Sequence, residues 1–133
     1  MKYMMLMQFG ADSELPPITT WTEDEVRAHI AFMGATNHKL IEDGEFVDAQ
    51  GLADPGRAKI VRSGDGGAPV VTDGPFPETK EFLVGYWIID VETEERAVEI
   101  AAYVSAAPGP GGKPLNMPIQ LRQIMDGPSP REA

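Results

Sequence analysis

Residues 70–91 read VVTDGPFPETKEFLVGYWIIDV, a polar turn that leads directly into an apolar strand. Prolines fix φ and glycine admits positive φ, so residues 73–77 are expected to form a defined turn. Alternation in the strand places Phe82, Val84, Tyr86, Ile88 and Asp90 on one face and Leu83, Gly85, Trp87, Ile89 and Val91 on the other. Both faces are largely apolar, which predicts a central strand covered on one side by helices and on the other by a partner subunit.

The elements around this strand follow one another in a mixed order. Short apolar or alternating runs predict strands at 2–9, 46–52, 59–62, 69–72 and 119–125. Helical periodicity predicts helices at about 22–44 and 94–105. This order is that of a split βαβ unit and predicts an α+β fold, a ferredoxin-like plait with an antiparallel sheet. We expect one domain over 1–133, with a loop at 106–118 and a frayed tail at 126–133.

The first helix has clear signals at both ends. Thr22 and Glu25 are spaced as a capping box, and Gly44 follows the last periodic residue. Its predicted apolar face consists of Val26, Ile30, Met33, Asn37, Leu40 and Ile41. Asn37 is the polar exception on this face. His29 flanks it, and His38 is expected to face solvent.

Composition excludes several classes of function. The chain has 133 residues, 11 basic and 21 acidic, for a net charge of −10, which disfavours nucleic acid and anionic membrane surfaces. It has no apolar run of about 18 residues, and its start does not resemble a signal peptide, so we expect a soluble, cytoplasmic protein. There is no Cys and there are two His, which predicts no metal site and chemistry without a cofactor.

Several segments resemble the YCII-related proteins of the DGPF subgroup. Asp73-Gly74-Pro75-Phe76 followed by Glu78-Thr79-Lys80-Glu81 is similar to the signature of that subgroup. The segments 1–7, 40–44 and 85–91 are similar to the same family, so the resemblance spans about 1–106. It implies a ferredoxin-like fold that pairs through its sheet face into a dimeric α+β barrel. It implies no particular activity, because most members have none assigned.

Asp73 is the leading candidate for a catalytic residue. In one interpretation it is a general base, or an acceptor for a substrate at the mouth of the barrel. In the other it caps its own Asp-Gly turn, as most such residues do. Phe76 is a candidate for substrate stacking, although an anchor that holds the turn against the core is the more common role.

Lys80 and Tyr86 are the other two candidate catalytic residues. Lys80 is either a positive group that faces Asp73 in a pocket or part of a solvated charged run. Glu81, its neighbour, points to the opposite face and is a candidate for substrate binding. The Tyr86 hydroxyl either donates a hydrogen bond to a substrate or is satisfied within the core.

His29 and Asn37 are candidate substrate-binding residues on the first helix. His29 is either an acid or base or a partly buried structural side chain. Asn37 needs a polar partner if it is buried, either as lining of a pocket or as a bridge from the helix to a strand. Some YCII-like proteins are proposed to use a His–Asp pair, but neither His of this chain matches that motif.

Two functions are compatible with these patterns. The first is a cofactor-independent enzyme that acts on a small molecule by proton transfer or hydrolysis in a pocket near the DGPF turn. The alternative is a non-catalytic ligand-binding or regulatory protein, which the resemblance links to sigma-factor-dependent transcription. An acidic surface suits a basic protein partner better than it suits DNA.

Overall fold

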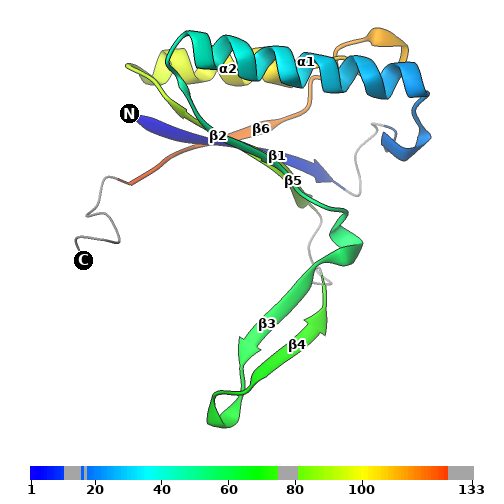
Figure 1. Cartoon of the computed structure of the whole chain (residues 1–133), viewed down its shortest axis with the longest axis vertical. Coiled ribbons are helices and arrows are strands. Elements are labelled where there is room, and N and C mark those ends of the chain that lie inside the picture. Colours follow the sequence, from blue (N-terminus) through cyan, green and yellow to red (C-terminus); the bar gives the residue numbers. More distant parts are fainter. Residues whose placement is uncertain (11–15, 17, 75–80, 126–133) are drawn as a thin grey trace.

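The main sheet has four antiparallel strands in the order β2-β5-β1-β6. The computed structural model describes residues 1–10, 16, 18–74 and 81–125. The strands of this sheet are β1 (Lys2–Gly10), β2 (Phe46–Gly51), β5 (Glu81–Asp90) and β6 (Ile119–Gln123). Helices α1 (Glu23–Glu42) and α2 (Glu94–Ser105) cover one face of the sheet (Figure 1). The predicted ferredoxin-like α+β fold is confirmed.

A hairpin is inserted between β2 and β5. Its strands β3 (Lys59–Ser63) and β4 (Pro69–Asp73) form a separate two-stranded sheet. The hairpin extends from the end of the main sheet, on the side away from the helices (Figure 1). Short 3₁₀ turns complete the described chain: η1 (Ile18–Thr20), η2 (Pro55–Arg57), η3 (Asp65–Gly67) and η4 (Pro110–Gly112).

The ends of α1 are those that the sequence predicts. The Thr22 hydroxyl accepts a hydrogen bond from the Glu25 amide at 3.1 Å, and Glu25 Oε1 accepts one from the Thr22 amide at 2.9 Å. This capping box satisfies two amides that the helix leaves unpaired. Gly44 has a φ of 72°, which ends the helix in the conformation that favours glycine. Within the described residues, no helix is both long enough and apolar enough to cross a membrane.

The buried face of α1 differs from the predicted one. Ile30 and Ile41 are 63% and 57% exposed, whereas Thr36 and Leu40 are buried. The reason is that α1 packs against α2 as well as against the sheet. Phe32 stacks on Tyr103 of α2 with ring centroids 5.1 Å apart, which turns the Ile30 flank outward. The prediction was therefore wrong for these two isoleucines, because the pattern of one helix does not show where its neighbours lie.

The core lies between the helices and the near face of the sheet. Met5, Ile89 and Val104 are its largest fully buried side chains, and Trp87 is 4% exposed. The far face carries apolar side chains that are half-buried, because no element of the described chain covers it: Met4, Leu6, Tyr86 and Ile88. We call this surface the open face. We expected β5 to be covered on both sides. Within the described residues the helices cover one side, and for that side the expectation is confirmed.

A β-bulge changes which face of the sheet the side chains near the start of β5 point to. Met7 pairs with Gly85, but Gln8 pairs with Leu83, so Val84 is the extra residue. Phe82, the partner of Phe9, therefore shares the face of Met7 and Gly85, on the helix side. Strict alternation had placed Phe82 with Tyr86 on the opposite face, and the bulge is the physical reason that this was wrong.

The Glu25 carboxylate joins the start of α1 to the segment that follows α2. Besides the cap, it accepts a hydrogen bond from the Gly111 amide at 2.6 Å. The amides of Thr22 and Gly111 bind the charged form and hold the pKa of Glu25 below its ordinary value. The stability that this carboxylate contributes is therefore complete above pH 4.5, its ordinary pKa, and is lost as the pH falls through the lower folded-state pKa.

We predict that Glu25→Gln lowers the thermal midpoint at pH 7. The difference from the parent protein should shrink as the pH falls below about 4.5, because the parent then loses the same charge. Thermal melts at several pH values measure this. Glu23→Gln, in the same helical turn, is the control and should change the midpoint less. An equal loss at pH 3 and pH 7 would contradict the assignment.

Candidate functional site

A cleft of about 900 Å³ lies between α1 and the helix-facing side of the sheet. Its walls are mainly apolar and come from seven parts of the chain: the approach to α1, α1 itself, the ends of β1, β2 and β5, the turn 53–55, and the segment before β6. The lining residues with the largest apolar side chains are Met7, Phe9, Trp21, Met33, Phe82, Trp87, Leu115 and Met117. A cleft of this size and composition is typical of sites for small organic molecules.

Two glycines, which have no side chain, leave room for the cleft on the surface of the sheet. Gly51 of β2 and Gly85 of β5 are cross-strand partners on the helix side. A Cβ at Gly85 would lie 3.0 Å from the Gln50 carbonyl oxygen, so this glycine also permits β2 to approach closely. A Cβ at Gly51 would meet no atom within 4 Å. The space above Gly51 is therefore open and can be filled by substitution.

His29 is held in one tautomer at the α1 wall. Its Nδ1 lies 3.0 Å from the Pro108 carbonyl oxygen. A carbonyl oxygen only accepts, so Nδ1 carries a proton and donates it, and Nε2 of the neutral ring keeps a lone pair. The ring also packs edge-on to Trp21, with centroids 5.4 Å apart and an interplanar angle of 81°. Nε2 has no hydrogen-bond partner among the described residues, so it is available to a ligand.

Asn37 bridges α1 to the central strand. Its Oδ1 accepts a hydrogen bond of 2.6 Å from the indole nitrogen of Trp87. Because the oxygen is used by Trp87, the Nδ2 amide group is the part of Asn37 that can donate to a ligand. Both residues line the cleft. Asn37 therefore both lines the pocket and bridges the helix to a strand, the two positions that the sequence left open.

Tyr86 lines the cleft, but its hydroxyl is engaged elsewhere. The hydroxyl donates to Asp48 Oδ2 at 3.1 Å, between β5 and β2. The bond to this carboxylate, together with burial, raises the pKa of Tyr86 above its ordinary value. Tyr86 and Asp48 lie on the open face, since Asp48 pairs with Ile88. In this arrangement the hydroxyl proton is already donated to a neighbouring residue.

Asp73 lies at the end of β4, with its side chain 84% exposed and paired with Lys59. It is not among the residues that line the cleft. Phe76 and Lys80 lie outside the described residues, as does the side chain of Glu81, whose backbone begins β5. The structure therefore brings His29 and Asn37 to one cleft, and Tyr86 borders it with its hydroxyl on the open face. The roles predicted for all seven residues stay predictions.

Sequence reasoning missed several walls of the cleft. Trp21, Gly51 and the turn 53–55 line it, as do Leu115 and Met117. A local signal existed at Gly51, since glycine in a strand often marks a close approach or a bare surface. No pattern around residue 115 indicates a cleft, because that segment meets α1 only through the tertiary fold. His38, by contrast, faces solvent as predicted and lies 3.2 Å from Glu42.

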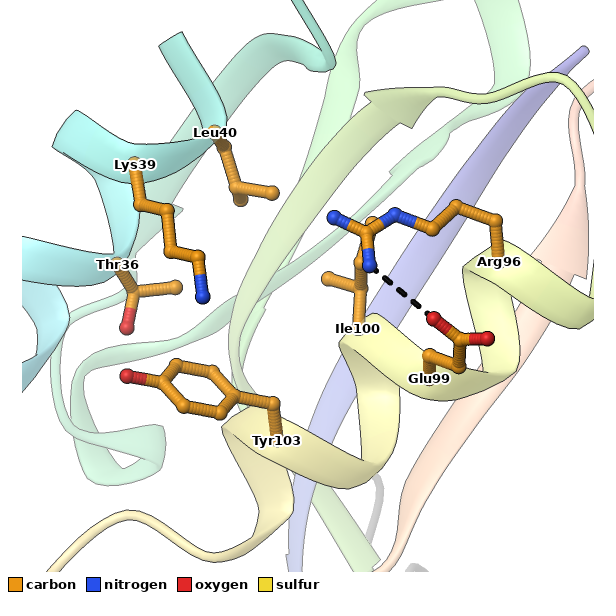
Figure 2. Close-up of a pocket in the computed structure, with 7 residues that line it drawn as sticks. All are labelled: Thr36, Lys39, Leu40, Arg96, Glu99, Ile100 and Tyr103. Carbon is orange, nitrogen blue, oxygen red and sulfur yellow. Dashed lines mark hydrogen bonds and ion pairs between the residues drawn. The ribbon is translucent and has the colours of Figure 1, made fainter. Parts of the chain in front are cut away.

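A second, smaller hollow of about 190 Å³ lies between α1 and α2 (Figure 2). The Lys39 ammonium lies 5.2 Å from the centre of the Tyr103 ring, a cation–π contact. Arg96 is bound to three carboxylates: Asp43, Glu45 and Glu99. These contacts join the two helices and leave no free guanidinium for an anionic ligand. Among the described residues, no three His, Asp or Glu gather as metal ligands.

The fold and the cleft define a ferredoxin-like α+β protein with a largely apolar site beside its sheet. The chain belongs to the YCII-related family, because the family model of the YCII-related domain matches residues 1–108. It is also similar to the uncharacterised protein R00369 of Rhizobium meliloti (strain 1021). The two are 29% identical over 111 residues, which cover 84% of this chain and 89% of that protein.

We predict that Asn37→Leu destabilises the fold by about 1–3 kcal/mol, because it leaves the buried Trp87 N–H without an acceptor. Asn37→Asp keeps an oxygen at this position and should be closer to the parent protein. Denaturant unfolding followed by tryptophan fluorescence measures both variants. Equal stability of Asn37→Leu and the parent would show that the Trp87 contact contributes nothing to the fold.

Proposed function

We propose that this protein is a cofactor-independent enzyme that binds a neutral, largely apolar small molecule in the cleft and transfers a proton with His29. The observation that carries the proposal is the bond from His29 Nδ1 to the Pro108 carbonyl. It leaves the basic nitrogen, Nε2, on a side chain that lines the cleft. A general base needs such a lone pair within reach of the substrate.

The lining supports a neutral substrate. Asp54 is the one charged residue among those that line the cleft, and no Lys or Arg of the described residues lines it. A phosphate or carboxylate in the cleft would therefore lose its hydration without gaining a positive partner. The net charge of −10 further disfavours an anionic substrate. The substrate class that fits is a neutral aromatic or alkyl compound with an acidic C–H or O–H group.

The spacing of the polar groups along α1 indicates the length of the substrate. His29, Met33 and Asn37 follow at intervals of four residues, so they lie along one side of the helix. Eight residues of helix separate His29 from Asn37 by about 12 Å along the axis. A substrate that reaches both would place its acidic hydrogen at His29 and a carbonyl or ether oxygen at the Asn37 amide, with Met33 packing against its apolar middle.

The chemistry that this arrangement supports is a proton shift. His29 Nε2 removes a proton from carbon or oxygen and returns it to another atom of the same substrate, without an electron carrier. No Lys or Arg of the described residues lines the cleft, so the Asn37 amide group is the donor that stabilises the developing negative charge. The alternative, a ligand-binding protein without turnover, uses the same apolar cleft and differs in that no proton moves.

The proposal is tested with a panel of neutral aryl ketones, of which benzylacetone is the first. The two tryptophans of the chain, Trp21 and Trp87, both line the cleft and report binding by fluorescence. Loss of the ketone α-hydrogens to D₂O, followed by NMR, reports proton transfer. We expect the parent protein to show both signals with at least one member of the panel.

Three variants separate binding from chemistry. His29→Gln keeps a donor for Pro108 but removes the base, so it should retain the fluorescence change and lose the exchange rate about 100-fold. Gly51→Leu fills the open space in the cleft and should lose both signals. Gly34→Leu, on α1 and outside the cleft lining, is the control for a larger side chain. Binding with equal exchange in the parent and His29→Gln would overturn the catalytic proposal. Absence of binding by the whole panel would overturn the assignment of the cleft.

A further inference from the structure

The segment that follows α2 forms a compact loop at one wall of the cleft. We call residues 107–115 the 107–115 loop. The Gly109 amide donates to the Lys113 carbonyl oxygen at 2.8 Å, and the Leu115 amide donates to the Ala107 carbonyl oxygen at 2.9 Å. A Cβ at Gly109 would overlap the Leu115 side chain, so this side chain packs directly on the backbone of the loop. Leu115 is 8% exposed and lines the cleft, so the loop is one packed unit that includes part of the wall.

Two hydrogen bonds join this loop to the start of α1 in the described part of the chain (Figure 1). His29 Nδ1 donates to the Pro108 carbonyl oxygen at 3.0 Å, and the Gly111 amide donates to Glu25 Oε2 at 2.6 Å. Glu25 and His29 are four residues apart, so they lie one turn apart on the same side of the helix. Pro108 and Gly111 are three residues apart. The two bonds therefore connect one turn of the helix to one turn of the loop.

The two bonds differ in strength. The acceptor of the Gly111 amide is the Glu25 carboxylate, and hydrogen bonds to charged groups are shorter and roughly twice as strong as bonds between neutral groups. The carboxylate is also held by its other oxygen, which accepts from the Thr22 amide at 2.9 Å. The bond from His29 joins a neutral imidazole to a neutral carbonyl. The contact of Glu25 is therefore the stronger of the two that hold the loop against α1.

We propose that Glu25 is a positioning residue for His29. By binding the Gly111 amide, its carboxylate holds the 107–115 loop at the distance from α1 at which the Pro108 carbonyl accepts from His29. That bond keeps the proton on Nδ1 and the lone pair on Nε2. The effect of Glu25 on a reaction rate rests on the proposed function, whereas its effect on the tautomer of His29 does not.

The tautomer matters because the two ring nitrogens exchange roles when the proton moves. Without a fixed carbonyl beside Nδ1, the neutral imidazole of His29 can carry its proton on either nitrogen. In the molecules that carry it on Nε2, this nitrogen donates and has no lone pair with which to take a proton from a substrate. Loss of the Glu25 contact should therefore slow the chemistry more than it weakens binding.

The proposal is tested by measuring the tautomer directly. The NMR chemical shifts of the two ring nitrogens report it at about pH 9, where imidazole is neutral. The chain has two histidines, so His38→Gln identifies the signals of His29. In the parent protein the proton should lie mainly on Nδ1. Glu25→Gln retains one acceptor oxygen for the helix cap and none for Gly111, and Glu25→Ala retains neither. Both variants should shift the ring signals toward the tautomer with the proton on Nε2.

The same two variants should also slow the hydrogen exchange of the ketone that the parent protein binds. We expect a loss of about tenfold, because displacement of a catalytic group by a remote substitution is costly even when the group itself is present. The change in tryptophan fluorescence on binding should be affected less than the exchange rate.

Thr22→Ala is the matched control at the same end of α1. It removes the hydroxyl that caps the helix but leaves the Glu25 carboxylate and the Gly111 amide in place. It should lower the thermal midpoint, because the helix loses its cap, while the tautomer of His29 and the exchange rate remain those of the parent protein. Circular dichroism confirms the fold of each variant.

Unchanged ring signals in both Glu25 variants would overturn the proposal, and so would an equal change of tautomer in Thr22→Ala. A change of tautomer without slower exchange would overturn the role of Glu25 in the reaction. If no ketone of the panel exchanges its hydrogens in the parent protein, the proposed function fails, and the comparison of tautomers still decides whether Glu25 positions His29.

Discussion

The hydrogen bond from the Trp87 indole to Asn37 is the contact on which the arrangement of the cleft depends. Trp87 is 4% exposed, so its N–H needs an acceptor inside the protein, and Asn37 supplies it at 2.6 Å. The bond joins α1 to the central strand at a point where both residues line the cleft. On the same helix His29 and Met33 line the cleft, whereas Ile30 is 63% exposed. A polar residue on an apolar helix face thus has both a structural role and a place in the site.

The cleft exists because the sheet surface beneath α1 is locally bare. The paired glycines Gly51 and Gly85 contribute no side chains there, and Phe82, which the bulge at Val84 places on the helix side, forms part of the wall. Close packing elsewhere fills the space between the helices and the sheet, as the fully buried Met5 and Ile89 show. The cleft therefore results from the local structure of one end of the sheet. β-bulges often occur next to functional sites.

Charge is distributed unevenly between the cleft and the outer surfaces. The cleft is apolar and contains no described Lys or Arg, which favours neutral molecules. The cations near the helices are used internally, since Arg96 binds three carboxylates and Lys39 lies over Tyr103. Arg57 and Arg62, by contrast, have no carboxylate partner among the described residues. The described cations therefore lie outside the cleft, and its lining is largely apolar.

The amino-acid sequence by itself determined the element order, the fold class and the ends of the first helix. These depend on local properties: alternation and periodicity of apolar residues, the Thr22–Glu25 capping box and the glycine after the helix. The family resemblance agreed with them. His29, Asn37 and Tyr86 could be selected from the sequence because each is a polar or ionisable residue on or beside an apolar face.

The tertiary structure alone decided which of these residues share a cleft and which atoms remain free. The tautomer of His29 is set by the Pro108 carbonyl, 79 positions away, and the Tyr86 hydroxyl is engaged by Asp48, 38 positions away. The outward flank of α1 follows from its packing on α2, and the facing of Phe82 follows from a bulge in the β1–β5 pairing. The local sequence pattern does not predict such long-range contacts, because they arise only when distant segments pack together.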